Sequence, residues 1–229
     1  MRYEIFGGNL PVALCKLDAG EEIFCERGAM SWMDDGIRME TYGGGIGKMF
    51  GRAFSGETMF RNRYVAETNG EIAFASSFPG EIRAVELYNG RSVIAQKRCL
   101  LAFDGGVETR VHFQKRFSTG FFGGEGFIMQ QFYGNGTVLL EIDGSAVEYY
   151  LAPGERKIVD TGHLVMMDDT CTMTVETVKG LKNKLLGGEG IFNTVITGPG
   201  KIILQTMPIS RMAERIYVYL PKENNNQRD

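Results

Sequence analysis

The sequence is poor in residues that bind metals. Its 229 residues include only two histidines, His112 and His163, whose spacing does not match that of ligands in one site. Four cysteines are present, without the short spacing of zinc ligands or the density of a disulfide framework: Cys15, Cys25, Cys99 and Cys171. We therefore expect no metal and no other cofactor. We also expect reduced thiols in a cytoplasmic compartment, with Cys99 buried in a strand.

Long apolar runs and a surplus of basic residues are also missing. No stretch approaches the roughly 20 apolar residues of a membrane-spanning helix, and residues 1–11 lack the apolar run of a signal peptide. The net charge is -3, which gives no overall attraction to nucleic acid or to an anionic membrane. We expect a cytoplasmic protein whose contact with a membrane, if it has one, is local and peripheral.

No motif identifies a reaction. The glycines before Lys48 resemble a phosphate-binding loop, but Tyr42 and Met49 stand where that motif needs Gly and Ser or Thr. The pairs Asp34-Asp35 and Asp168-Asp169 offer neighbouring carboxylates, yet each falls where a turn between strands is expected. We interpret them as turn residues and predict that the protein is not an enzyme.

The strongest signal in the sequence is a spacing pattern of glycine and acidic residues that occurs three times. Gly20, Gly90 and Gly154 each precede an aspartate by 14 residues, and each is followed further on by a Gly-Glu pair. The aspartates are Asp34, Asp104 and Asp168, and the pairs begin at Gly56, Gly124 and Gly188. Such self-similarity indicates three related units. We place them at residues 1–80, 81–145 and 146–220, followed by a disordered polar tail at 221–229.

Short apolar segments bounded by Gly, Asn and Asp predict strands in every unit. The first unit is expected to hold strands at residues 12–17 and 23–27 and a hairpin over 29–41. Each unit is then expected to end in a second hairpin, formed by residues 59–67 with 71–76, 127–133 with 138–142, and 191–197 with 201–206. The predicted fold class is all-β, with three tandem β-sandwich units of about 65 to 70 residues.

Several motifs resemble a known family. They are Tyr3-Glu4-Ile5-Phe6-Gly7-Gly8, the run from Glu26 to Asp34, Gly43-Gly44-Gly45, Phe54-Ser55-Gly56-Glu57 and Asn62-Arg63-Tyr64. Together they resemble the altered-inheritance-of-mitochondria family over residues 1–219. The family contains bacterial proteins of unknown function and mitochondrial relatives linked to inner-membrane organisation.

The resemblance implies a fold similar to the tryptophan RNA-binding attenuation protein, a double-stranded β-helix, with short helical insertions in this chain. It also implies a homotrimer that forms a ring of nine units. It supplies no catalytic residues, and RNA binding does not follow from a shared fold.

Charge is segregated along the chain. Residues 43–55, 110–124 and 177–188 contain eight of the 25 Lys and Arg residues and none of the 28 Asp and Glu residues. In the first segment Ile46, Met49, Phe50, Ala53 and Phe54 have the spacing of one apolar helix face. The candidate docking residues are Lys48, Met49, Phe50, Arg52, Phe54, Lys115, Arg116, Phe121, Phe122, Lys179, Lys182, Lys184 and Leu185.

Two interpretations of these segments remain open. Their apolar residues either pack within the protein and between its copies, or form a basic-apolar ring face that docks an anionic lipid surface or a membrane complex. The leading functional hypothesis is a non-enzymatic scaffold or binding protein that uses this face. RNA binding is the alternative, which the acidic total makes unlikely, and a small-molecule enzyme in the sandwich interior is the third.

Overall fold

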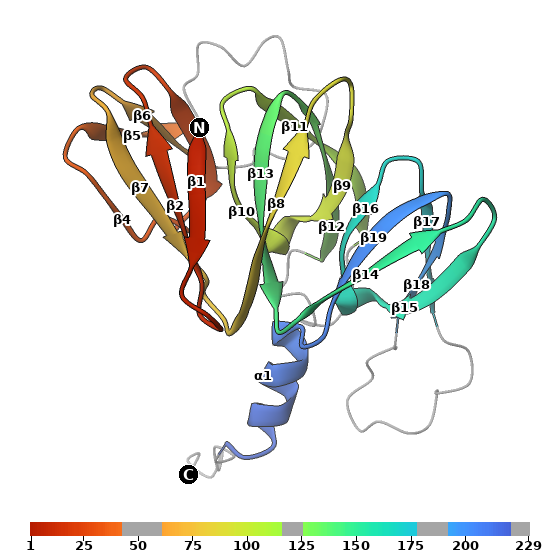
Figure 1. Ribbon diagram of the computed structural model, residues 1–229. Coiled ribbons are helices and arrows are strands. Elements are labelled where there is room, and N and C mark those ends of the chain that lie inside the picture. Colours follow the sequence, from red (N-terminus) through yellow and green to blue (C-terminus); the bar gives the residue numbers. More distant parts are fainter. Residues whose placement is uncertain (43–60, 116–125, 178–191, 221–229) are drawn as a thin grey trace, which may run out of the picture.

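In the residues that it describes, a computed structural model shows an all-β protein with one short α-helix (Figure 1). The structure describes residues 1–42, 61–115, 126–177 and 192–220. Three antiparallel sandwich units spread like a fan from one point, and the α-helix leaves that point on the other side. The predicted all-β sandwich class is therefore confirmed.

Each unit contributes six or seven strands. Those of the first unit are β1 (Arg2–Phe6), β2 (Val12–Leu17), β3 (Glu22–Glu26), β4 (Trp32–Met33), β5 (Ile37–Tyr42), β6 (Arg61–Ala66) and β7 (Gly70–Ala75). Those of the second are β8 (Gly80–Leu87), β9 (Val93–Gln96), β10 (Leu100–Asp104), β11 (Val107–Lys115), β12 (Phe127–Gly134) and β13 (Gly136–Asp143). Those of the third are β14 (Ala146–Leu151), β15 (Arg156–Asp160), β16 (Leu164–Asp168), β17 (Thr172–Thr177), β18 (Phe192–Thr197) and β19 (Gly200–Gln205).

Neighbouring units share sheets. Sheet A has the order β1-β2-β7-β4 and belongs to the first unit, whereas sheet D has the order β15-β18-β17 and belongs to the third. Sheet B (β5-β6-β3-β10-β13-β8) joins the first unit to the second, and sheet C (β11-β12-β9-β16-β19-β14) joins the second to the third. Hydrogen bonding is therefore continuous across both internal boundaries.

The predicted hairpins are wrong, although their strands exist. Within 29–41, β4 pairs with β7 in sheet A whereas β5 pairs with β6 in sheet B. The predicted hairpin at the end of each unit fails in the same way, because β6 and β7, β12 and β13, and β18 and β19 lie in different sheets. Most tight turns thus carry the chain from one sheet of a sandwich to the other.

Alternating side chains explain the sandwich. In β17, Thr172, Thr174 and Glu176 are exposed while Met173 and Val175 are half-buried, as the period of two predicts. Three apolar cores follow the row of units. They are formed around Tyr64 and Phe74 of the first unit, around Phe132 and Leu140 of the second, and around Ile196 of the third together with Phe127 of the second. Burial of these large side chains is the main stabilising contribution.

The end of the third unit, for which no element was predicted between residues 207 and 220, is helical. After β19 the chain forms α1 (Ile209–Tyr217), which projects away from the sandwiches (Figure 1). Two short 3-10 turns, Lys97–Cys99 and Thr161–His163, precede β10 and β16. The predicted helix near Ile46 and the predicted disordered tail lie outside the described residues.

Candidate interaction surfaces

The repeated aspartates have one structural role. The Oδ2 atoms of Asp34, Asp104 and Asp168 accept hydrogen bonds from the backbone amides of Glu71, Thr137 and Lys201, at 2.8, 2.7 and 2.8 Å. In each unit this bond ties the turn after one strand to the start of the last strand. The matching glycines, Gly20, Gly90 and Gly154, have φ values of +88°, +79° and +78°, which a side chain would disfavour. The interpretation of the aspartates as turn residues is confirmed, and the spacing pattern is explained by the fold.

The four thiols are buried. Burial raises the pKa of Cys15 and of Cys25 to about 12, and it also raises the pKa of Cys99 and Cys171. A neutral thiol is a poor nucleophile and a poor metal ligand. The prediction that Cys99 is buried is confirmed, and its Sγ lies 3.6 Å from Oε1 of Gln96.

The histidines are ordinary polar residues of their strands and turns. The Nδ1 atom of His163 lies 2.7 Å from the carbonyl oxygen of Gln205. Burial, followed by the charge of Arg110, lowers the pKa of His112. Among the residues that the structure describes, no group of three or more His, Cys, Asp or Glu side chains is placed to hold a metal ion.

Most of the candidate docking residues lie outside the described ranges, and Lys115 is the one that can be placed. Its Nζ donates to the carbonyl oxygen of Val175 at 3.2 Å and lies 5.7 Å from the centre of the Phe192 ring. Lys115 therefore connects the second unit to the third. The topology does relate the three basic-apolar segments to one another, since they connect β5 to β6, β11 to β12 and β17 to β18.

The internal joints are the contacts by which one unit continues into the next. In the first, β3 pairs with β10, so that Phe24 lies opposite Phe103 and Ile23 opposite Asp104. In the second, β9 pairs with β16, so that Ile94 lies opposite Met167 and Val93 opposite Asp168. The two joints therefore have the same register relative to the repeated aspartate.

Each joint places an apolar side chain of one unit in the core of the next. Phe24 packs against the core of the second unit, where its ring stacks on Phe103 with 5.5 Å between the ring centres. Ile94, which is 1% exposed, belongs to the core of the third unit. The joints are thus apolar contacts as well as backbone pairings.

A buried arginine in the first joint was not found from the sequence. The Nη2 atom of Arg61 donates to Oε1 of Gln130 at 3.0 Å, and the guanidinium lies 5.0 Å from the centre of the Phe103 ring. Burial lowers the pKa of Arg61, while Glu26 raises it. No signal in the sequence distinguishes this arginine from an exposed strand residue, because Gln130 and Phe103 come from the second unit.

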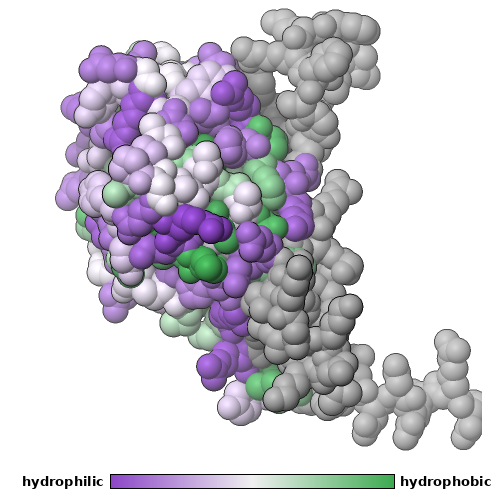
Figure 2. Space-filling model, turned by 90° about the vertical axis from the view of Figure 1, so that its right-hand side faces the viewer, coloured by the Kyte–Doolittle hydropathy of each residue, from purple (hydrophilic) through white to green (hydrophobic). Residues whose placement is uncertain are grey.

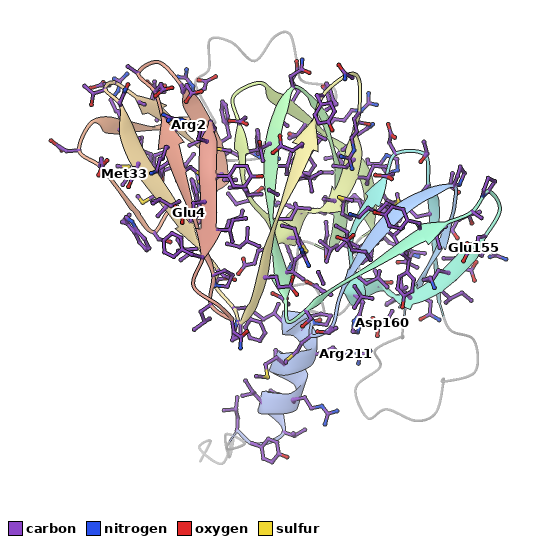
Figure 3. The ribbon with its side chains drawn as sticks, viewed as in Figure 1. Arg2, Glu4, Met33, Glu155, Asp160 and Arg211 are labelled. Carbon is purple, nitrogen blue, oxygen red and sulfur yellow. The ribbon has the colours of Figure 1, made fainter. Side chains whose placement is uncertain are left out.

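At the two ends of the row of units, the strands that correspond to joint strands are sheet edges. β15 is the counterpart of β3 and β9 and is an edge of sheet D, and β4 is the counterpart of β10 and β16 and is an edge of sheet A. Figure 3 shows Met33 of β4 and Glu155, just before β15, at opposite ends of the molecule. Ile158 follows Gly154 as Ile94 follows Gly90, yet it is 65% exposed.

The same contrast holds at the other end. Trp32 precedes Asp34 as Ala102 precedes Asp104 and Met166 precedes Asp168. Ala102 and Met166 are 0% and 1% exposed, whereas Trp32 is 52% exposed. The end of the molecule near sheet D is largely hydrophilic, with hydrophobic residues gathered towards its middle (Figure 2). Both open edges therefore carry exposed apolar residues at positions that are buried inside the chain.

The described residues include no helix of the length and apolar character that a membrane span requires. Among proteins of known sequence, the chain is 28% identical over 227 residues to an uncharacterised protein of Streptococcus pyogenes serotype M6, an alignment that covers 95% of this chain and 90% of the relative. A crystal structure of another Streptococcus pyogenes protein, solved by a structural genomics consortium, superposes with a TM-score of 0.77 at 26% identity and covers 96% of this chain and 99% of that chain. A family model described as mitochondrial biogenesis AIM24 matches residues 3–207. The chain therefore belongs to the mitochondrial biogenesis AIM24 family.

Proposed function

We propose that this protein is a non-enzymatic scaffold whose copies join head to tail, with β15 of one copy pairing with β4 of the next. The observation that carries the proposal is the exposure of Ile158, whose counterparts Phe24 and Ile94 each pack in the core of the following unit. Within the described residues β15 has no such neighbouring unit beside it, and in the proposal the first unit of another copy supplies the equivalent core.

The internal joints define the register of the proposed contact. If Asp34 takes the place of Asp104 and Asp168, then Met33 lies opposite Ile158 and Trp32 lies opposite Val159. Covering Ile158 and Trp32 contributes roughly 1.5–3 kcal/mol for each side chain that becomes fully buried. Pairing also removes two sheet edges, which otherwise template uncontrolled aggregation.

The proposed contact has one charged feature that the internal joints lack. Lys157 takes the place of the buried residues Ile23 and Val93, and its Nζ lies 3.8 Å from the centre of the Tyr149 ring. In the register above, Lys157 of one copy faces Asp34 of the next. A lysine on an edge strand discourages pairing with wrong partners, and an opposing aspartate makes the correct partner favourable.

Three copies are proposed to close the assembly into a ring of nine units, as the family resemblance suggests. The test is the mass of the protein in solution, compared between the natural chain and the variant Ile158→Asp. A trimer has three times the 25.4 kDa of the chain. The proposal predicts a trimer for the natural chain and a folded monomer for the variant. A natural chain that stays monomeric at micromolar concentration contradicts it.

A second candidate function is the docking of this scaffold on an anionic lipid surface. The observation that favours it is that the three basic-apolar segments connect equivalent strand pairs, so a ring repeats each of them in the same topological place. Sedimentation with anionic and neutral vesicles tests it. Binding to anionic vesicles that is weakened when Lys48, Arg52, Lys182 and Lys184 are changed to Glu supports docking. Salt-dependent retention of single-stranded RNA without vesicle binding supports the RNA alternative instead.

A further inference from the structure

The three units begin at one point, which we call the hub and define by residues 7–11, 76–80, 143–146 and 206–209. The start of each unit is hydrogen-bonded to the start of the unit before it. The amide of Gly80 donates to the carbonyl oxygen of Asn9 at 2.8 Å, and the amide of Gly144 donates to that of Pro79 at 2.8 Å. The series continues once more, because the amide of Met207 donates to the carbonyl oxygen of Asp143 at 3.1 Å. Met207 therefore lies where a fourth unit would begin.

The helix α1 follows Met207 in place of the first strand of a fourth unit. Two carboxylates from earlier in the chain hold it, one in the hub and one at the end of β15. The amide of Ile209 donates to Oδ2 of Asp143 at 2.8 Å, and the guanidinium of Arg211 forms an ion pair with Asp160. Figure 3 shows Arg211 at the start of α1 beside Asp160. Asp160 is the last residue of β15, so α1 begins next to the edge strand of the proposed contact.

Several side chains on α1 and just after it are apolar and exposed. Ile209 and Ile216 are 46% and 49% exposed, and the five residues from Ile216 to Leu220 are all exposed apolar or aromatic residues. A group of exposed apolar residues at a helix end is normally covered by other protein or by lipid. On the first unit, Phe6 at the end of β1 and Leu10 in the turn before β2 are a matching pair of exposed apolar residues.

We propose that α1 is a clasp between copies, covered by the β1–β2 turn of the next copy, with Phe6 and Leu10 of that copy packing against Ile209 and Ile216. This inference rests on the proposed head-to-tail assembly. Within the chain, each unit starts beside the start of the unit before it. The first unit of the next copy therefore starts beside Met207, where α1 already lies, and the two exposed apolar surfaces meet there. The clasp extends the contact from the strand edge to the hub.

The test measures the dissociation constant between copies by sedimentation over a dilution series. The variants are Leu10→Asp and Ile216→Asp, one on each side of the clasp, and the matched control is Tyr150→Asp, an exposed aromatic residue on β14. Each clasp variant is expected to raise the dissociation constant about tenfold or more, as truncating a buried interface residue commonly does. The control is expected to leave it unchanged. Thermal unfolding of each dissociated variant should match that of the dissociated natural chain, because all three positions are exposed in one copy.

The possible results distinguish an error in the clasp proposal from an error in the assembly proposal. If the natural chain assembles and Ile158→Asp dissociates it, but Leu10→Asp and Ile216→Asp have no effect, the clasp is wrong and the edge pairing stands. If the natural chain does not assemble, both proposals fail. If Ile216→Asp leaves assembly intact and abolishes sedimentation with anionic vesicles, α1 faces lipid and the clasp is overturned.

Discussion

The two internal joints and the two open edges are built from corresponding strands but have opposite exposures. In the joints, Ile94 and Ala102 are buried by the neighbouring unit, whereas at the ends Ile158 and Trp32 are exposed. The described residues therefore contain three strands of the β3 type, and only two of them pair with a strand of a neighbouring unit. Repeat proteins commonly protect their terminal units with polar caps. Under the proposal, another copy acts as the cap, because apolar residues are exposed at both ends of this chain.

The largest difference in stability between a joint variant and an edge variant is expected when the same substitution is made in each. Ile94→Asp places a carboxylate in the core of the third unit and should lower the free energy of unfolding by about 3–5 kcal/mol. Ile158→Asp changes the corresponding residue on the open edge and should leave the stability of the single chain unchanged. Denaturant unfolding of both variants at a concentration where the chain is monomeric checks this. Equal losses of stability would show that Ile158 is already part of a core.

The alkylation rate of the Cys25 thiol shows how readily the first internal joint opens, since Cys25 pairs with Ala102 across that joint. Burial raises its pKa to about 12 from an ordinary value of 9.0. The thiolate fraction at pH 8 should therefore be lower by roughly a thousandfold than in the unfolded chain, and the rate of alkylation should fall with it. The rate should rise about tenfold for each unit of pH until the pKa is reached. Mass spectrometry of labelled peptides measures it, with the unfolded protein as reference. Fast labelling of Cys25 in the native protein at pH 8 would mean that the joint opens readily.

Removing one of the repeated carboxylates should lower the free energy of unfolding by less than burying a charge does in Ile94→Asp. Asp168→Ala leaves the amide of Lys201 without its acceptor and should destabilise the chain by about 1–3 kcal/mol. Asp34→Ala removes the same bond to Glu71 at the end of the row and should cost a similar amount in the single chain. In the assembly Asp34→Ala should also weaken association, because Lys157 of the neighbouring copy loses the carboxylate that it faces. Unfolding and sedimentation data on both variants would separate the two effects. If Asp168→Ala weakens association as much as Asp34→Ala, the proposed register is wrong.

The smallest effect is expected from the charge on the edge strand. Lys157→Glu should weaken association by about tenfold, because it faces Asp34 of the next copy, whereas Lys157→Ile should restore the apolar residue of the internal joints and preserve association. The measurement is the dissociation constant at low and high salt. An effect of Lys157→Glu that salt does not reduce would argue against an ion contact.

The sequence predicted the strands and turns well because these depend on neighbouring residues. Gly20, Asp34 and their counterparts mark turns by their own backbone preferences, and alternation along β17 marks its exposed face. Pairing was predicted wrongly because the same turn residues serve a hairpin and a crossing between two sheets. Which of the two forms depends on partners such as β7 for β4, about 40 residues away in the sequence.

The helix α1 and the buried Arg61 are two further features that the sequence did not predict. Pro208 precedes α1 without capping it by a side chain, and the carboxylate that binds its first amide belongs to Asp143 of the second unit. The usual local signal for the start of a helix is therefore missing. Arg61 was missed for a similar reason, because Gln130 and Phe103, which contact its guanidinium, come from another unit. Features that depend on contacts between units could not be read from one unit's residues.

The open edges are the central claim, and the mass of the protein in solution tests it most directly. Sedimentation equilibrium of the natural chain and of Ile158→Asp, at the same concentrations, compares an intact edge with a disrupted one. The account predicts three times 25.4 kDa for the natural chain and 25.4 kDa for a folded Ile158→Asp variant. A natural chain that is monomeric throughout, or a variant that assembles as well as the natural chain, would contradict it.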